Sequence, residues 1–308
     1  MRNVQYPSNL ALLESGELEK RIDSSIRLLS HCTLCPWECV VDRTEGELGE
    51  CRTSSTARIY SYSPHHGEER PLRGRGGSGT IFFSGCNMHC QFCQNADISQ
   101  ENYGTLVSAE KIAEMMLDLQ ARGCHNINLV SPTHVVPQII EALSIAAQKG
   151  LCLPLVYNTG GYDSVDTLKL LDGIIDIYMP DMKYADTDNA KKYSLVVNYP
   201  HHNQEAVIEM HHQVGDLEFD QNGIAEKGLL VRHLVLPDNI SNTQQVMTFL
   251  AQKISPNTYV NIMDQYRPEY NTNQFPELRR PVSADEFQSA VEIALSCGIK
   301  RIDHLMSG

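Results

Sequence analysis

The chain has 308 residues, with 25 lysines and arginines against 38 aspartates and glutamates and a formal net charge of −13. This length suffices for one large domain or two ordinary ones with a sizeable buried core. The acidic balance argues against a general nucleic-acid binder or a protein that binds an anionic membrane surface. The first residues lack the apolar core of a signal peptide, and no apolar run approaches about 18 residues, so no membrane helix is expected.

Ten cysteines are present, and seven of them stand in spacings typical of metal sites. Such usage fits a reducing, cytoplasmic setting better than a disulfide scaffold. The other three, Cys124, Cys152 and Cys297, are expected to be core thiols.

An amphipathic helix is expected first, over about residues 8–30, followed by a cysteine-rich stretch with few apolar residues at 31–57. From about residue 79, strand-like and helix-like segments alternate. The expected strands are 80–84, 125–131, 153–157, 174–179, 228–236 and 258–263. The expected helices are 108–122, 134–149, 163–172, 186–196, 202–213, 240–254 and 283–297. This alternation predicts an α/β fold with a parallel sheet, as an open sheet or a partial barrel, whose chemistry collects at the C-terminal ends of the strands.

Three cysteines follow the first expected strand in a C-x3-C-x2-C spacing, Cys86, Cys90 and Cys93. A closed electron-transfer cluster normally takes four cysteines, so three thiolates on a cubane iron–sulfur cluster leave one iron open. The ligand that this spacing suggests is S-adenosylmethionine (SAM), which chelates iron through its amine and carboxylate and can be cleaved reductively to a radical. The alternative is a zinc knuckle or three buried thiols, although zinc sites prefer four tightly paired ligands.

The segment 76–95, with the alternation behind it, resembles the radical SAM superfamily. More narrowly, it resembles the pyruvate formate-lyase activating-enzyme group and its PflX-like branch. The resemblance implies a partial (β/α)6 TIM-like barrel over 76–308, a [4Fe-4S] cluster on the three cysteines, and Phe92 packed near the adenine of SAM. Residues 1–75 are then expected to form an N-terminal helix and a cysteine-rich, metal-binding extension.

The second and third expected strands end in polar residues that the resemblance assigns to SAM. Ser131 and Thr133 stand where activating enzymes usually carry a Gly-Gly-Glu phrase that holds the amino group of SAM. Their alternative role is to cap the next helix. Asn158 and Thr159 stand where related enzymes contact the SAM carboxylate or a monovalent cation. The alternative for this pair is a bare turn.

The fourth and fifth expected strands carry the remaining candidates. Asp181 and Lys183 resemble the Asp-x-Lys phrase of the activating enzymes, with the aspartate near the cation or ribose and the lysine facing the carboxylate. A solvated ion pair, which contributes little stability, is the alternative. Arg232 matches a family arginine that approaches SAM, and a guanidinium suits bidentate recognition of a carboxylate.

Four further cysteines lie upstream in the spacing C-x2-C-x3-C-x11-C, at Cys32, Cys35, Cys39 and Cys51. Four thiolates over this span can form a tetrahedral zinc site or bind an auxiliary iron–sulfur cluster. Because the segment has few apolar residues, we expect a metal to hold its shape. A metal-free knuckle is the alternative.

These features predict a radical SAM enzyme, an oxidoreductase that cleaves SAM to a 5′-deoxyadenosyl radical for hydrogen abstraction and takes its electrons from a donor such as flavodoxin or ferredoxin. The resemblance suggests activation of a glycyl-radical partner. Another polypeptide or a small molecule is also open as the substrate, and so is a non-catalytic iron–sulfur electron-transfer protein.

Overall fold

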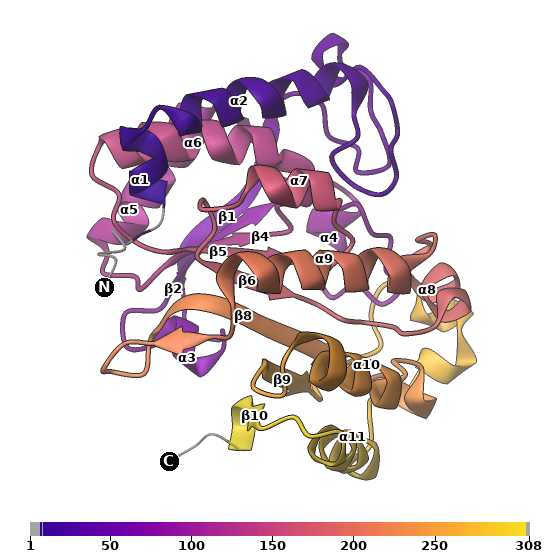
Figure 1. Cartoon of the computed structure of the whole chain (residues 1–308). Helices are drawn as coiled ribbons and strands as arrows, with labels where there is room; N and C mark the ends of the chain where they lie inside the picture. The colour runs from indigo at the N-terminus through magenta and orange to yellow at the C-terminus, as the bar shows by residue number, and fades with distance from the viewer. Residues whose placement is uncertain (1–6, 8, 306–308) are drawn as a thin grey trace.

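The computed structural model describes residues 7 and 9–305 (Figure 1). Its centre is one sheet in the order β10-β9-β8-β6-β5-β4-β2-β1-β3, with β7 paired to β8. The strands are β1 Ala57–His65, β2 Ser78–Phe83, β3 Thr105–Val107, β4 Ile127–Val130, β5 Leu155–Thr159, β6 Ile177–Pro180, β7 Glu218–Phe219, β8 Ala225–Leu234, β9 Tyr259–Met263 and β10 Arg301–Ile302.

The six expected strands are confirmed as β2, β4, β5, β6, β8 and β9. Each pairs in parallel with the next, so their C-terminal ends meet at one edge of the sheet. The sheet is open, which corresponds to the expected α/β architecture of partial-barrel type. The short strands β1 and β3, which pair antiparallel on the far side of β2, were not expected.

Helices correspond to every helical segment expected from the sequence. The α-helices are α1 Asn9–Glu14, α2 Glu17–Arg27, α3 Arg70–Arg73, α4 Ala96–Ser99, α5 Ala109–Ala121, α6 Val136–Gln148, α7 Val165–Leu170, α8 Thr187–Ser194, α9 Tyr199–Val214, α10 Thr243–Phe249 and α11 Ala284–Ser296. The segment expected as one helix at 8–30 is broken at Gly16, whose φ of 70° is left-handed. Within the described part of the chain, no helix has the length and apolar character needed to span a membrane.

The N-terminal segment packs on the βα core. Helices α1 and α2 lie over α6 (Figure 1), and Arg21 of α2 donates to the carbonyls of Leu170 at 2.9 Å and Asp172 at 2.8 Å, at the end of α7. Strand β1, which also precedes residue 75, belongs to the sheet itself. The division of the chain at residue 75 stays a prediction.

The segment after β1 crosses to the opposite side of the sheet. Glu69, just before α3, accepts a hydrogen bond of 2.9 Å from Asn261 Nδ2 on β9. Only 7% of Glu69 is exposed. This contact joins the two sides of the open sheet and gives the space between them a polar wall.

His233 on β8 links the sheet to its surrounding helices. Its Nδ1 lies 2.8 Å from the Met182 carbonyl and its Nε2 lies 3.0 Å from Thr243 Oγ1 at the start of α10. Burial lowers the pKa of His233 to about 4, so the ring is neutral at pH 7. In the unfolded chain His233 has the ordinary histidine pKa of about 6.5. As the pH falls, the unfolded chain therefore binds a proton at this ring before the folded chain does.

We therefore expect stability from His233 to be complete above about pH 6.5 and to decline toward about pH 4. In the His233→Gln variant this proton uptake on unfolding is lost. The slope of the unfolding free energy against pH, measured by urea unfolding, should therefore be smaller than in wild type by about 1.4 kcal/mol per pH unit in that window. The exposed His212→Gln serves as the control. Identical pH profiles for wild type and His233→Gln would contradict the assignment.

Candidate functional site

The three motif cysteines open onto one cavity at the C-terminal ends of the parallel strands. Cys86, Cys90 and Cys93 line a space of about 180 Å³. Burial, followed by the neighbouring thiols, raises the pKa of Cys86 to about 12. Burial likewise raises the pKa of Cys90 to about 11, against the opposing charge of Lys183. The thiols therefore share one site, and bound iron would hold them as thiolates.

The donor set fits a cluster with an open iron. Three thiols line the cavity, and a [4Fe-4S] cluster held by three thiolates keeps one iron free for a further ligand. A structural zinc ion prefers four closely paired ligands. Among the described residues, the ligand atoms of one group of three potential ligands all lie within 4.8 Å of one another, and that group is His201, His202 and Glu205 on the surface of α9 rather than the motif cysteines.

A buried charge network lies beside the thiols. Asp181, just after β6, accepts a hydrogen bond of 2.8 Å from Arg232 Nε. It also accepts a hydrogen bond from Lys183 Nζ, with which it forms an ion pair. The guanidinium reaches further through Nη2 to Asn158 Oδ1 on β5, at 2.7 Å. The Asp181 and Arg232 backbones form a parallel bridge, which extends the pairing of β6 and β8. The sequence-predicted residues from three strands thus form one connected group.

The pKa values of this network show that attraction outweighs burial. Burial by itself raises the pKa of Asp181, but Arg232 and Lys183 outweigh it and hold that pKa below its ordinary value. Burial lowers the pKa of Lys183, and Asp181 more than restores it, so the pKa is raised. The three groups are therefore charged at neutral pH and carry a net positive charge beside the cavity.

Ser131 and Thr159 also line the cavity. Ser131 has φ 56°, an unusual left-handed conformation for a residue with a side chain, and its N–H donates to the Asn158 carbonyl at 2.9 Å. A Cβ at the adjacent Gly160 would lie 2.6 Å from Met88 Sδ. The backbone here therefore approaches the cysteine loop closely, as a tightly held ligand site requires.

Thr133 belongs to a second set of hydrogen-bonded side chains, centred on the Asp163 carboxyl. Its hydroxyl donates to Asp163 at 2.7 Å and lies 3.1 Å from the Thr159 hydroxyl, which donates to the same carboxyl. Tyr157 also donates to Asp163, at 3.0 Å. Asp163 is 2% exposed, and burial raises its pKa while these donors oppose the shift. This carboxyl was not expected from the sequence, because no pattern in the chain links it to Thr133, thirty residues earlier.

Phe92 lies in an adjoining cavity of about 210 Å³, together with Cys90, Cys93 and Arg232. Its ring packs edge-on against Tyr266, with centroids 5.8 Å apart. An aromatic ring thus lies in a cavity that adjoins the motif cysteines, and its contact with the adenine of SAM stays a prediction.

A third cavity, of about 650 Å³, shares Asn158 and Arg232 with the cysteine site. Glu68 and Glu69 line it. Burial, the charge of Glu69 and a hydrogen bond between the two carboxyl groups raise the pKa of Glu68 to about 7, against the opposing charge of Arg232. This pair was not expected from the sequence, since two consecutive glutamates form no recognisable motif. Their burial depends on contact with β9, where Asn261 donates to Glu69.

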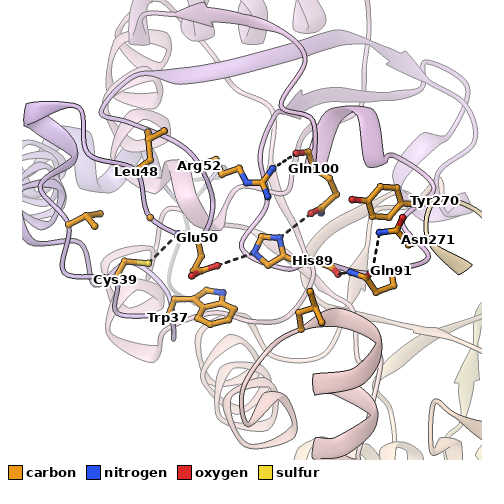
Figure 2. Close-up of a pocket in the computed structure, with 13 residues that line it drawn as sticks. Trp37, Cys39, Leu48, Glu50, Arg52, His89, Gln91, Gln100, Tyr270 and Asn271 are labelled. Atoms are coloured by element: carbon orange, nitrogen blue, oxygen red, sulfur yellow. Dashed lines mark hydrogen bonds and ion pairs between the residues drawn. The ribbon is translucent and has the colours of Figure 1, made fainter. Parts of the chain in front are cut away.

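Four upstream cysteines lie behind the motif loop. Cys32, Cys35 and Cys51 are buried, whereas Cys39 is half-buried on a groove of about 700 Å³ (Figure 2). All ten cysteines are free thiols. Cys152 is exposed, so its expected place in the core is wrong; it follows the turn after α6, where the chain returns to the surface.

A model of the radical SAM superfamily matches residues 80–250. The chain is 30% identical over 296 residues to Uncharacterized protein MJ0674 of Methanocaldococcus jannaschii, covering 93% of this chain and 81% of that protein. A radical SAM methyltransferase from Sphaerobacter thermophilus has a similar fold, with TM-score 0.51 and 15% identity over 72% of this chain and 64% of that one. The FeFe-hydrogenase maturase HydG from Carboxydothermus hydrogenoformans also has TM-score 0.51, with 12% identity over 95% of this chain and 69% of that one.

The family match covers more than half of the chain and includes the three motif cysteines. The chain belongs to the radical SAM superfamily. Members of this superfamily are enzymes that use a [4Fe-4S] cluster and SAM, and the cysteine site described above has the three thiols that such a cluster needs.

Removing the negative charge at Asp181 should destabilise the protein strongly. The Asp181→Asn variant leaves Arg232 and Lys183 buried without their carboxylate, and loss of one partner from such a network costs about 3–5 kcal/mol. The matched control is Asp166→Asn, which breaks an exposed pair with Lys169 worth less than about 1 kcal/mol. Anaerobic urea unfolding followed by circular dichroism measures both; equal losses would contradict a buried network.

Proposed function

We propose that this radical SAM enzyme binds its cluster through Cys86, Cys90 and Cys93 and cleaves SAM reductively to start hydrogen abstraction. When bound and reduced, the cluster supplies one electron to the SAM sulfonium, whose carbon–sulfur bond breaks to give methionine and a 5′-deoxyadenosyl radical. The observation that carries the proposal is the single cavity onto which three thiols and the Asp181 network open.

The charged network is suited to hold the polar end of SAM. Arg232 is held from two sides, by Asp181 and by Asn158, so its planar donors are oriented before a ligand arrives. Lys183 brings a second cation to the same wall. We assign both to the SAM carboxylate, and Asp181 to the ribose or a monovalent cation.

The other residues near the cavity suit the ammonium and adenine groups of SAM. Ser131 and Thr159 present carbonyl and hydroxyl oxygens that can accept from the SAM ammonium. Thr133 and Thr159 both donate to the Asp163 carboxyl, so Thr133 helps to hold Thr159 in position. Phe92 offers its ring to the adenine from the adjoining cavity. A reducing, cytoplasmic setting with a flavodoxin or ferredoxin as electron donor suits the free thiols.

For the substrate, we propose a protein glycine in a glycyl-radical partner, as in the PflX-like branch. The Asp181-x-Lys183 phrase and the cysteine motif support this assignment. A second candidate is a small cationic molecule, favoured by the adjacent carboxyl groups of Glu68 and Glu69 in the cavity next to Arg232. An ammonium group between Glu68 and Glu69 would interact with both carboxyl groups.

Loss of one motif thiol should abolish SAM cleavage. Anaerobically reconstituted wild type with dithionite and SAM is expected to form 5′-deoxyadenosine and methionine, measured by liquid chromatography. Cys90→Ala is expected to lower the rate by roughly a hundredfold or more, since the cluster loses a ligand. Cys152→Ala, an exposed thiol far from the motif in sequence, is the control. Retention of cleavage by Cys90→Ala would overturn the proposal.

The two substrate classes differ in a measurable product. If a protein glycine is the substrate, reduced enzyme and SAM mixed with a formate-lyase-like protein give a persistent glycyl-radical signal by electron paramagnetic resonance (EPR). The Glu69→Gln variant should leave that signal in place. If a small cation is the substrate, no persistent signal forms, and deuterium from a deuterated amine appears in 5′-deoxyadenosine only when Glu69 is intact.

A further inference from the structure

The four upstream cysteines belong to one site. The loop folds back on itself, since Val40 N–H donates to the Cys32 carbonyl at 3.0 Å and Cys32 N–H donates to the Val41 carbonyl at 3.1 Å. Burial raises the pKa of Cys35, and the charges of Cys51 and Cys39 add to this effect. Burial also raises the pKa of Cys51, and the charge of Cys32 adds to this effect. Each of the four thiols therefore interacts with another of the set.

A buried positive charge faces this set. Arg43 is 1% exposed, and its Nη1 lies 3.8 Å from Cys32 Sγ. Its Nε and Nη2 donate to the Ser54 carbonyl, at 3.1 Å and 2.7 Å. A buried guanidinium is stable only beside compensating negative charge, and metal-bound thiolates supply it. Neutral thiols would leave Arg43 without a counterion, so the metal-free alternative fits poorly.

Redox chemistry separates the two kinds of metal centre that four thiolates can hold. Zinc has no redox states, whereas an iron–sulfur cluster accepts and passes on an electron. The choice between them therefore follows from where the upstream set lies relative to the SAM-site loop.

The upstream set touches both residues that flank Cys86. Asn87, which follows it, makes a side-chain hydrogen bond with the Cys35 thiol. Gly85, which precedes it, lies so close to Cys51 that a Cβ there would stand 2.7 Å from the Cys51 carbonyl oxygen. Trp37 adds a hydrogen bond of 2.7 Å from Nε1 to the Asn87 carbonyl. One residue therefore separates each of two upstream cysteines from a ligand of the SAM-site cluster.

The other side of the set faces solvent. Figure 2 shows Cys39 on the wall of the groove formed by the extension, with His89 and Gln91 of the motif loop across from it. His89 Nε2 lies 3.4 Å from Glu50 Oε2, which joins the two walls. A redox partner can therefore approach the set at Cys39, from a groove whose lining includes none of the three motif cysteines.

We propose that Cys32, Cys35, Cys39 and Cys51 hold a second [4Fe-4S] cluster that relays electrons to the SAM-site cluster. One electron from a reduced flavodoxin or ferredoxin reduces the second cluster, which is then reoxidised as it reduces the first; no atom is transferred. The relay rests on the proposed function, whereas the second cluster itself does not.

Metal content tests the second cluster without SAM chemistry. The triple variant Cys86→Ala, Cys90→Ala, Cys93→Ala, prepared anaerobically, is expected to retain about four iron and four sulfide per chain, no zinc, and after dithionite an EPR signal that SAM does not shift. Wild type should hold about twice that iron. Zinc without iron in the triple variant would overturn the second cluster, and so would a triple variant that holds no metal.

The relay is tested by comparing two reductants. Dithionite is small enough to reach the SAM-site cluster directly, whereas flavodoxin must use the surface. In the variant with all four upstream cysteines replaced by serine, the ratio of flavodoxin-driven to dithionite-driven SAM cleavage is expected to fall roughly tenfold or more. Cys152→Ser is the matched control. An unchanged ratio would overturn the relay.

Freeze-quench EPR on wild type gives a second test that needs no folded variant. With flavodoxin, the SAM-insensitive signal should appear before the SAM-sensitive one; the reverse order would overturn the relay. If wild type cleaves no SAM even with dithionite, the proposed function fails, while the metal content of the triple variant still decides on the second cluster.

Discussion

The site depends on one buried carboxylate. Asp181 holds Arg232 and Lys183 together at the ends of β6 and β8, where both cations are buried and their charges need compensation. Its own pKa stays low because their attraction exceeds the cost of burial. Two cations are thereby kept in place beside three thiols, which gives the cavity at the strand ends a wall suited to an anionic group.

Parallel pairing explains why these groups meet. Because β2, β4, β5, β6 and β8 run in one direction, the cysteine loop, Ser131, Asn158, Asp181 and Arg232 emerge at the same edge although they span much of the chain. Arg232 lines all three adjoining cavities, so a single side chain borders the space assigned to SAM, the aromatic cavity and the larger acidic cavity. The larger cavity and the cysteine cavity therefore share part of their walls.

The motif loop is also supported from behind. Trp37, Cys35 and Cys51 of the extension contact the residues on either side of Cys86, so the extension is built into the cluster site rather than attached to it. Strand β1, which connects the two, is part of the sheet. Through this continuity the extension helps to fix the position of the motif loop.

The sequence by itself determined the six parallel strands and the cysteine loop, because buried strands produce short apolar runs and an open cluster needs three closely spaced thiols. It also marked Asn158, Asp181, Lys183 and Arg232 as polar residues at strand ends. Only the tertiary structure decided that these four share one network, that Thr133 serves Asp163, and that Glu69 meets Asn261 across the open sheet. Such contacts join residues far apart in the chain or on separate loops, and local patterns carry no information about which of them meet.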